Sequence, residues 1–234
     1  MKFFDFFLKK NSSHIEGIEI RRSLRRTRTV SLKIKNGKAI IFCPNFVNDN
    51  YLRDIILKKK NWIKNKLKKE INVIELSETK KFPILGKSYK IRFLESKKNE
   101  VKVIGDSIRI SCNTKKKMKS IFIPWLKNQS KNYLKRRLSK LSDRIKIDFK
   151  SVFIKTYKAR WGCCNSSSEI FLNWKLILLP KGIVDYVIIH ELAHILVPNH
   201  SKRFWLAVAE LDPNYVEKKD WLKENGNNYI RFNE

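Results

Sequence analysis

Paired cysteines are missing from this chain of 234 residues. Its four cysteines are Cys43, Cys112, Cys163 and Cys164, and none of them forms a Cys-x-x-Cys pair. Because adjacent cysteines rarely bond to each other, the pattern excludes a small scaffold held together by disulfides. A reducing, cytoplasmic location fits this cysteine usage best.

Long apolar runs are missing as well. The N-terminal segment MKFFDFFLKK is apolar but short, and Asp5 interrupts it. It is too short to span a bilayer, and it lacks the long apolar region and small-residue cleavage site of a signal peptide. The sequence therefore predicts no transmembrane segment.

Acidic residues are scarce: 22 Asp and Glu stand against 52 Lys and Arg, for a formal net charge of +30. The basic excess is strongest in the N-terminal half. A positive field of this size attracts polyanions, so nucleic acids, nucleotides and anionic lipid heads are candidate partners. The plainer alternative is that lysine simply fills surface positions.

Apolar residues make up 42% of the chain, enough to bury a core.

Short alternating runs dominate residues 18–113. The dipeptides at the turns of three expected hairpins are Asn36-Gly37, Gly86-Lys87 and Gly105-Asp106. One amphipathic basic helix is expected over residues 50–69. No internal repeat and no low-complexity linker is evident, so we expect a basic, β-rich N-terminal region over residues 1–118.

Longer helical patterns follow in residues 119–234. Two β-like runs, 151–157 and 169–174, interrupt a series of expected helices over 119–142, 181–197, 201–211 and from Pro213, with Gly226 at the position of a C-terminal cap. The expected fold class is therefore α+β, with a helical C-terminal domain after the β-rich region.

Histidine is rare here, yet three of the four histidines fall within residues 190–200. His190 and His194 are four residues apart on an expected helix, so both rings lie on one face, one turn apart. With Glu191 they form His-Glu-x-x-His, in which two imidazoles bind Zn²⁺ and the glutamate acts as the general base. Chance matches to this short motif occur, in which the histidines merely pack.

A catalytic zinc ion usually has three protein ligands and one open position. Pro198 ends the helix and Asn199 can reverse the chain, so His200 is the candidate third ligand. Glu210 and Glu217, on later helices, are the competing candidates. Together these residues predict a zincin-like, metal-binding C-terminal domain with zinc as its cofactor.

The segment RWGCCNSSSEIFLNWKLILLPKGIVDYVIIHELAHILVPNHSKRFW resembles the YgjP-like metallopeptidase family, which is related to the SprT-like and WLM zinc proteins. The matching positions are Arg160-Trp161-Gly162, Cys164, Leu172-Asn173-Trp174, Asp185-Tyr186-Val187, His190, Glu191, His194, Asn199-His200-Ser201 and Phe204-Trp205. The resemblance is dense over residues 157–226. It implies a hydrolytic zinc site with His190, His194 and His200 as ligands and Glu191 as base. The chain departs from the family pattern where Cys163 replaces a serine, and where Pro198 precedes Asn199.

Arg160 follows an expected strand and precedes a glycine turn. It could bind an anionic substrate or a developing oxyanion. The alternative is a structural ion pair with Asp185. Asn173 and Cys164 are expected to be structural, and Cys164 to be a packing thiol.

Three functions remain open at this point. The first is a zinc metallopeptidase, which should offer a free strand edge beside the histidine helix for a peptide or protein substrate. The second is a pyrophosphatase acting on UTP or another nucleoside triphosphate, as some relatives are assigned, which should gather several basic side chains at the metal. The third is a nucleic-acid-associated protein, with or without protease activity, whose basic surface should form one continuous stripe.

Overall fold

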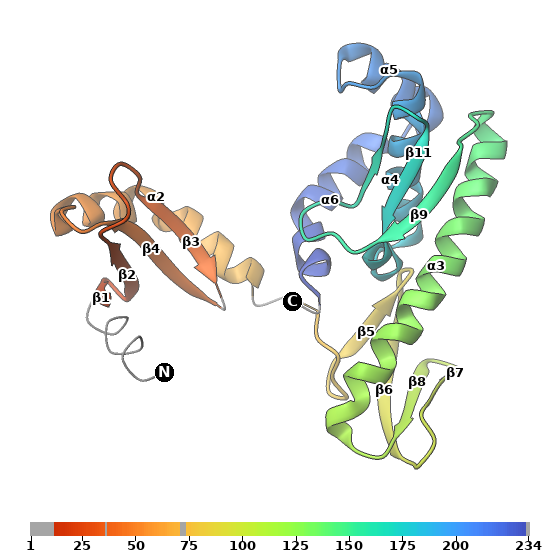
Figure 1. Cartoon of the computed structure of the whole chain (residues 1–234), viewed down its shortest axis with the longest axis horizontal. Coiled ribbons are helices and arrows are strands. Elements are labelled where there is room, and N and C mark those ends of the chain that lie inside the picture. Colours follow the sequence, from red (N-terminus) through yellow and green to blue (C-terminus); the bar gives the residue numbers. More distant parts are fainter. Residues whose placement is uncertain (1–11, 36, 71–73, 233–234) are drawn as a thin grey trace. The chain divides into compact units, whose positions relative to one another are not determined.

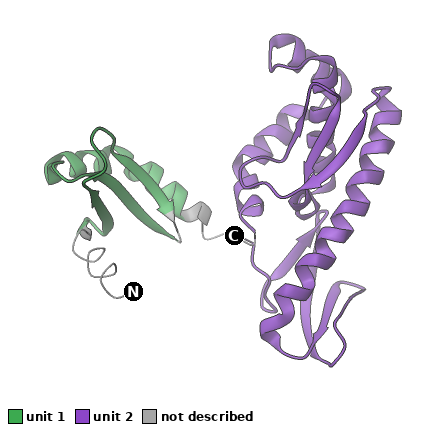
Figure 2. Cartoon of the chain, viewed as in Figure 1, with its two compact units in different colours: residues 1–72 green, residues 73–234 purple. Residues whose placement is uncertain are grey.

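The computed structural model describes residues 12–35, 37–70 and 74–232. The chain divides into two compact units, unit 1 (Met1–Asn72) and unit 2 (Val73–Glu234), shown in Figure 2. This boundary lies earlier than the one expected between residues 118 and 119. The reason is that Phe82 and Ile110, from the strands before residue 118, share one buried cluster with Phe122 and Ile177.

The described part of unit 1 is a four-stranded sheet followed by one helix. Its strands are β1 (Ser12–Ile15), β2 (Ile18–Ser23), β3 (Ser31–Lys35) and β4 (Lys38–Pro44), and its helix is α2 (Asp49–Glu70). The strand order is β1-β2-β4-β3. The expected hairpin is present, because β3 and β4 pair antiparallel and Gly37 has φ 70°, although Asn36 lies outside the described residues.

The first half of unit 2 is also a four-stranded sheet followed by a helix. Its strands are β5 (Lys81–Ile84), β6 (Lys87–Glu95), β7 (Glu100–Ile104) and β8 (Ser107–Cys112), followed by the 3-10 turn η1 (Lys115–Lys117) and helix α3 (Met118–Ile145). The strand order is β5-β6-β8-β7. The first turn falls at Leu85-Gly86, one residue before the expected position, because these are the residues that adopt positive φ.

These two sheet-and-helix segments have the same topology. In each, the two outer strand pairs are antiparallel and the central pair is parallel. The first turns also match, with φ 50° and 78° at Glu16 and Gly17 against 51° and 81° at Leu85 and Gly86. The expectation of no internal repeat was therefore wrong. The repeat is hidden in the sequence because branched apolar residues replace one another freely at buried strand positions.

The second half of unit 2 is a small sheet covered by helices (Figure 1). Its elements are β9 (Ser151–Lys155), β10 (Gly162–Cys164), β11 (Glu169–Asn173), the 3-10 turn η2 (Trp174–Leu178), and helices α4 (Lys181–Leu196), α5 (Lys202–Leu211) and α6 (Tyr215–Ile230). The strand order is β10-β11-β9, so β10 and β9 are the outer strands. Strands and helices together confirm the α+β class.

Helix α4 is the centre of this half. It contacts α3, α5, α6, β10 and β11, and it is apolar on almost every side. Val184, Ile188 and Leu192 are fully buried in its main cluster. Each such side chain stabilises the fold by about 1.5–3 kcal/mol relative to exposure, so α4 is a firmly held platform.

Helix α6 runs past Gly226, which is therefore not a C-terminal cap as the sequence suggested. A Cβ atom at Gly226 would lie 3.1 Å from Leu222 Cδ1 and 3.3 Å from Trp161 Nε1. The glycine instead lets the side chains of Leu222 and Trp161 pack closely against this point of the helix. In the part of the chain that is described, no helix has the length and apolar character needed to cross a membrane.

Candidate metal centre

Three histidines converge at the C-terminal end of α4. His190 and His194 lie on the helix, and His200 lies in the loop that follows it. Their candidate ligand atoms all lie within 4.8 Å of one another, and His200 Nε2 is 3.0 Å from His190 Nε2. Two nitrogens bound to one zinc ion, each at about 2.1 Å, stand at most about 4.2 Å apart, so small side-chain rotations suffice to fit one ion.

The loop after α4 brings His200 back to the helix. The helix ends at Leu196, Val197 turns extended at φ −139°, and Pro198 prevents continuation. The Asn199 side chain then accepts a hydrogen bond from the Ser201 amide at 3.3 Å. The chain reverses as the sequence predicted, and Glu210 and Glu217 do not join the histidine group among the described residues.

Two aromatic side chains from α5 frame the histidines. The Phe204 ring is fully buried and its centroid lies 4.4 Å from that of His194 and 4.8 Å from that of His200. The Trp205 ring is stacked against His200 at 5.7 Å, and Lys219 Nζ lies 4.0 Å from the Trp205 ring centroid. These contacts restrict the imidazole rotamers, a role that spacing alone did not reveal.

The setting of His190 and His194 favours their uncharged forms. Burial, together with repulsion from His194, His200 and Lys219, lowers the pKa of His190 to about 3. Burial also lowers the pKa of His194. The donor set fits a metal ion, because neutral imidazole is the form that binds metals and three imidazoles suit zinc.

Glu191 lies beside this group and is almost fully buried, with 5% of its surface exposed. Burial raises the pKa of its carboxyl group to about 8, against the opposing attraction of Arg160. Its carboxylate packs directly on the backbone of Gly162 in β10, where a Cβ atom would lie 2.7 Å from Glu191 Oε1. Sequence reasoning missed this role for Gly162, although the glycine was visible in the Arg-Trp-Gly motif.

Arg160 is positioned by Asn173. The Asn173 side-chain amide donates hydrogen bonds of 3.0 Å to the carbonyl oxygens of both Tyr157 and Arg160. The guanidinium lies 5.6 Å from the centroid of the Tyr157 ring. Asp185 pairs with Arg137 at 2.5 Å instead, so the proposed Arg160–Asp185 ion pair is wrong. The charge of Arg160 acts instead on Glu191, whose pKa it lowers.

The cysteines beside the site stay outside the histidine group. Burial, with some repulsion from Glu191, raises the pKa of the Cys164 thiol to about 11. A thiol with such a pKa is protonated at neutral pH and is a poor metal ligand. Cys163 Sγ lies 3.9 Å from the Tyr157 hydroxyl.

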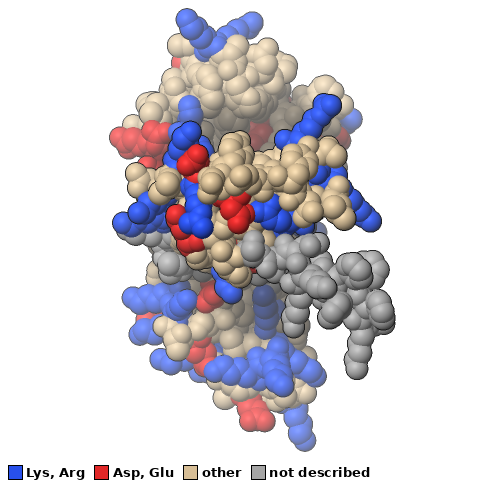
Figure 3. All heavy atoms as spheres, turned by 90° about the vertical axis from the view of Figure 1, so that its left-hand side faces the viewer, with Lys and Arg blue, Asp and Glu red and all other residues tan. Residues whose placement is uncertain are grey.

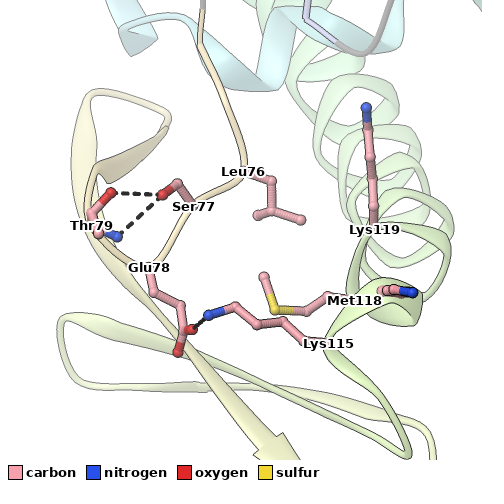
Figure 4. A pocket seen from close by; sticks show the side chains of 8 residues that line it. Leu76, Ser77, Glu78, Thr79, Lys115, Met118 and Lys119 are labelled. Atoms are coloured by element: carbon pink, nitrogen blue, oxygen red, sulfur yellow. Dashed lines mark hydrogen bonds and ion pairs between the residues drawn. The ribbon is translucent and has the colours of Figure 1, made fainter.

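Basic side chains gather elsewhere in unit 2. A hollow of about 290 Å³ lies at the start of α3 and is lined among others by Lys115, Lys116 and Lys119. Figure 4 shows the side chains that line it. Lys115 pairs there with Glu78, and none of the lining residues belongs to α4 or α5. Figure 3 shows Lys and Arg interspersed with Asp, Glu and uncharged residues on the side that it draws.

Comparison with known proteins gives one extensive match. The family model described as YgjP-like, metallopeptidase domain, matches residues 28–225. No curated protein matches the chain.

Two kinds of solved structure resemble part of the chain. The metallopeptidase zymogen abylysin of Pyrococcus abyssi is 24% identical, with a TM-score of 0.35 over 38% of this chain and 90% of that one. Wss1 of Saccharomyces cerevisiae is 15% identical, with a TM-score of 0.31 over 59% of this chain and 92% of that one.

Proposed function

The chain belongs to the YgjP-like metallopeptidase family, which makes it a metal-dependent hydrolase, and we propose that it is a zinc peptidase in which His190, His194 and His200 hold the ion. The observation that carries this proposal is the convergence of the three imidazoles within 4.8 Å beside a buried carboxylate. Zinc bound there would supply a Lewis acid that polarises a carbonyl group and acidifies water.

Glu191 is the proposed general base. Its carboxylate takes a proton from water and passes that proton to the nitrogen of the leaving amine. Burial raises the pKa of this carboxyl group, which helps it to hold the proton until the leaving amine takes it. Gly162 behind the carboxylate and the fixed helix α4 limit its movement.

Arg160 is proposed to bind the substrate or the oxyanion that develops at its carbonyl group. A guanidinium is permanently charged and offers several donors in one plane. The two hydrogen bonds from Asn173 fix the backbone of the Tyr157–Arg160 segment, and the charge of Arg160 acts on Glu191.

Strand β10 supplies a place for an extended peptide. It is an outer strand of its sheet, and its first residue, Gly162, touches the carboxylate of Glu191. A peptide added to this free edge would gain backbone hydrogen bonds and would pass Glu191. The triphosphate and nucleic-acid alternatives gain no comparable support, because the lysines that converge do so at the start of α3.

The test incubates the zinc-loaded protein with casein and, separately, with nucleoside triphosphates, with a Glu191→Gln variant alongside. We expect new amino termini from casein, no release of phosphate or pyrophosphate, and no cleavage by the variant. Hydrolysis of triphosphates without casein cleavage would contradict the peptidase assignment. Full activity of Glu191→Gln would contradict the proposed base.

A further inference from the structure

The internal repeat allows equivalent positions of the two sheet-and-helix segments to be compared. Several features recur at the same interval along the chain: Gly17 and Gly86 in the first turn, and the buried cysteines Cys43 and Cys112 in the fourth strand. Helices α2 and α3 also begin at this interval, at Asp49 and Met118. The same parts of the two segments can therefore be compared.

In unit 2, a short apolar turn covers the space between the first hairpin and the helix. The Leu85 amide donates a 2.8 Å hydrogen bond to the carbonyl oxygen of Ile177, in η2. Ser130 of α3 donates another, of 2.6 Å, to the carbonyl oxygen of Trp174. The side chains of Trp174, Ile177 and Leu178 are buried in the cluster that the sheet and α3 form. The chain thus supplies its own occupant here.

In unit 1, the corresponding space is an open groove of about 520 Å³ between the strand turns and α2. This is within the range of about 300–1,000 Å³ that binding pockets usually have. Its apolar lining comprises Ile18, Ala39, Ile56, Ile63 and Leu67. The Glu16 amide, at the place of the Leu85 amide, has no hydrogen-bond partner among the described residues. No described segment of unit 1 takes the place of η2.

Charge at the groove distinguishes among occupants. Lys38, Lys60 and Lys64 line it together with His14, against the single carboxylate of Glu16. An acidic peptide is attracted to such a rim, and a basic one is repelled. The N-terminal segment MKFFDFFLKK, although apolar, is itself basic.

We propose that this groove of unit 1 is a docking site for a partner polypeptide. The segment it binds is a short turn of aromatic and aliphatic side chains flanked by Asp or Glu, seated as η2 is seated in unit 2. Its apolar side chains cover Ile56 and Ile63, its backbone carbonyl accepts from the Glu16 amide, and its acidic flanks meet Lys60 and Lys64. Binding does not require the metal centre.

The test uses a fluorescent peptide that carries NWKLIL, the sequence of Asn173 and η2, between pairs of aspartates, titrated with the whole zinc-loaded chain by fluorescence anisotropy. We expect saturable binding, at least tenfold weaker for the same peptide with lysine flanks. The double variant Lys60→Glu/Lys64→Glu should weaken binding at least tenfold. The matched control, Lys58→Glu/Lys59→Glu, changes exposed lysines of α2 that do not line the groove and should bind as the original does.

Three results would overturn the proposal. The first is absence of binding, or equal affinity for the peptide with aspartate flanks and the peptide with lysine flanks. The second is equal loss in the control variant. The third is peptide binding that appears only after residues 1–10 are removed, or only when a dimer of this chain dissociates. In either case a segment of the chain itself would occupy the groove. Casein cleavage by Lys60→Glu/Lys64→Glu would continue, so failure here is distinguishable from failure of the proposed function.

Discussion

Substituting alanine for Gly162 tests the contact between β10 and the proposed base. A Cβ atom there would lie 2.7 Å from Oε1, 2.8 Å from Cγ and 2.9 Å from Cδ of Glu191. Ordinary van der Waals contacts of a Cβ atom begin at about 3.4 Å, so the Glu191 side chain or the strand must move by several tenths of an ångström. Gly162 is not among the residues with positive φ, so the strain is steric.

The expected cost follows from that displacement. A misplacement of about 1 Å in a catalytic group can reduce a rate on the order of 10²-fold, and we expect a kcat loss of that order for Gly162→Ala. Overpacking a buried site costs about 1–3 kcal/mol, and each kcal/mol lowers Tm by about 2–4 °C in a domain of this size. Zinc content should be unchanged, because no ligand is altered.

The assay measures kcat for peptide hydrolysis, zinc content and Tm for Gly162→Ala against Gly182→Ala. Gly182 lies on the same helix as Glu191, and the nearest atom to a Cβ there is 3.9 Å away, at the end of Lys218. Gly182→Ala should keep full activity. Full kcat in Gly162→Ala, or an equal loss in both variants, would refute the reasoning.

Three further predictions follow from the site. His194→Ala should lose zinc, and one zinc per chain in that variant, by elemental analysis, would contradict the ligand assignment. The contribution of His190 to the unfolding free energy of the metal-free protein should fall by about 1.4 kcal/mol between pH 7.5 and 5.5, because the folded-state pKa of His190, about 3, lies below its ordinary 6.5. That contribution is complete above the ordinary pKa and is lost as the pH falls towards 3. Denaturant titrations measure it as the difference between the original chain and His190→Asn, in which Glu191, whose raised pKa acts in the opposite direction, is common to both; a difference that does not change with pH would contradict it. Cys164, with a pKa of about 11 against an ordinary 9.0, should react with iodoacetamide at pH 8 roughly a hundredfold more slowly than in the unfolded chain, and equal rates by mass spectrometry would contradict its burial.

The histidine cluster could be predicted from the sequence because its determinants are local. A spacing of four residues on a helix fixes the relation of His190 to His194, and Pro198 fixes where the chain must turn. The contact of Gly162 with Glu191 could not be predicted in this way. It joins a strand to a helix through the packing of β10 on α4, and no local pattern encodes that packing.

Packing between elements, which no local pattern encodes, also explains why the partner of Asp185 and the boundary between the units differ from those expected from the sequence. The sequence suggested Arg160 as the partner of Asp185, but the packing of α3 against α4 brings Arg137 to Asp185 instead. The boundary was expected where the composition becomes helical. It lies earlier because the strands before α3 form their core with that helix.

The most direct test of the central claim compares zinc content and peptide hydrolysis in the same samples of the original chain and of Glu191→Gln. The account predicts one zinc per chain in both proteins, with casein cleaved by the original chain and left intact by the variant. A variant that holds zinc and cleaves casein at the original rate would contradict the account.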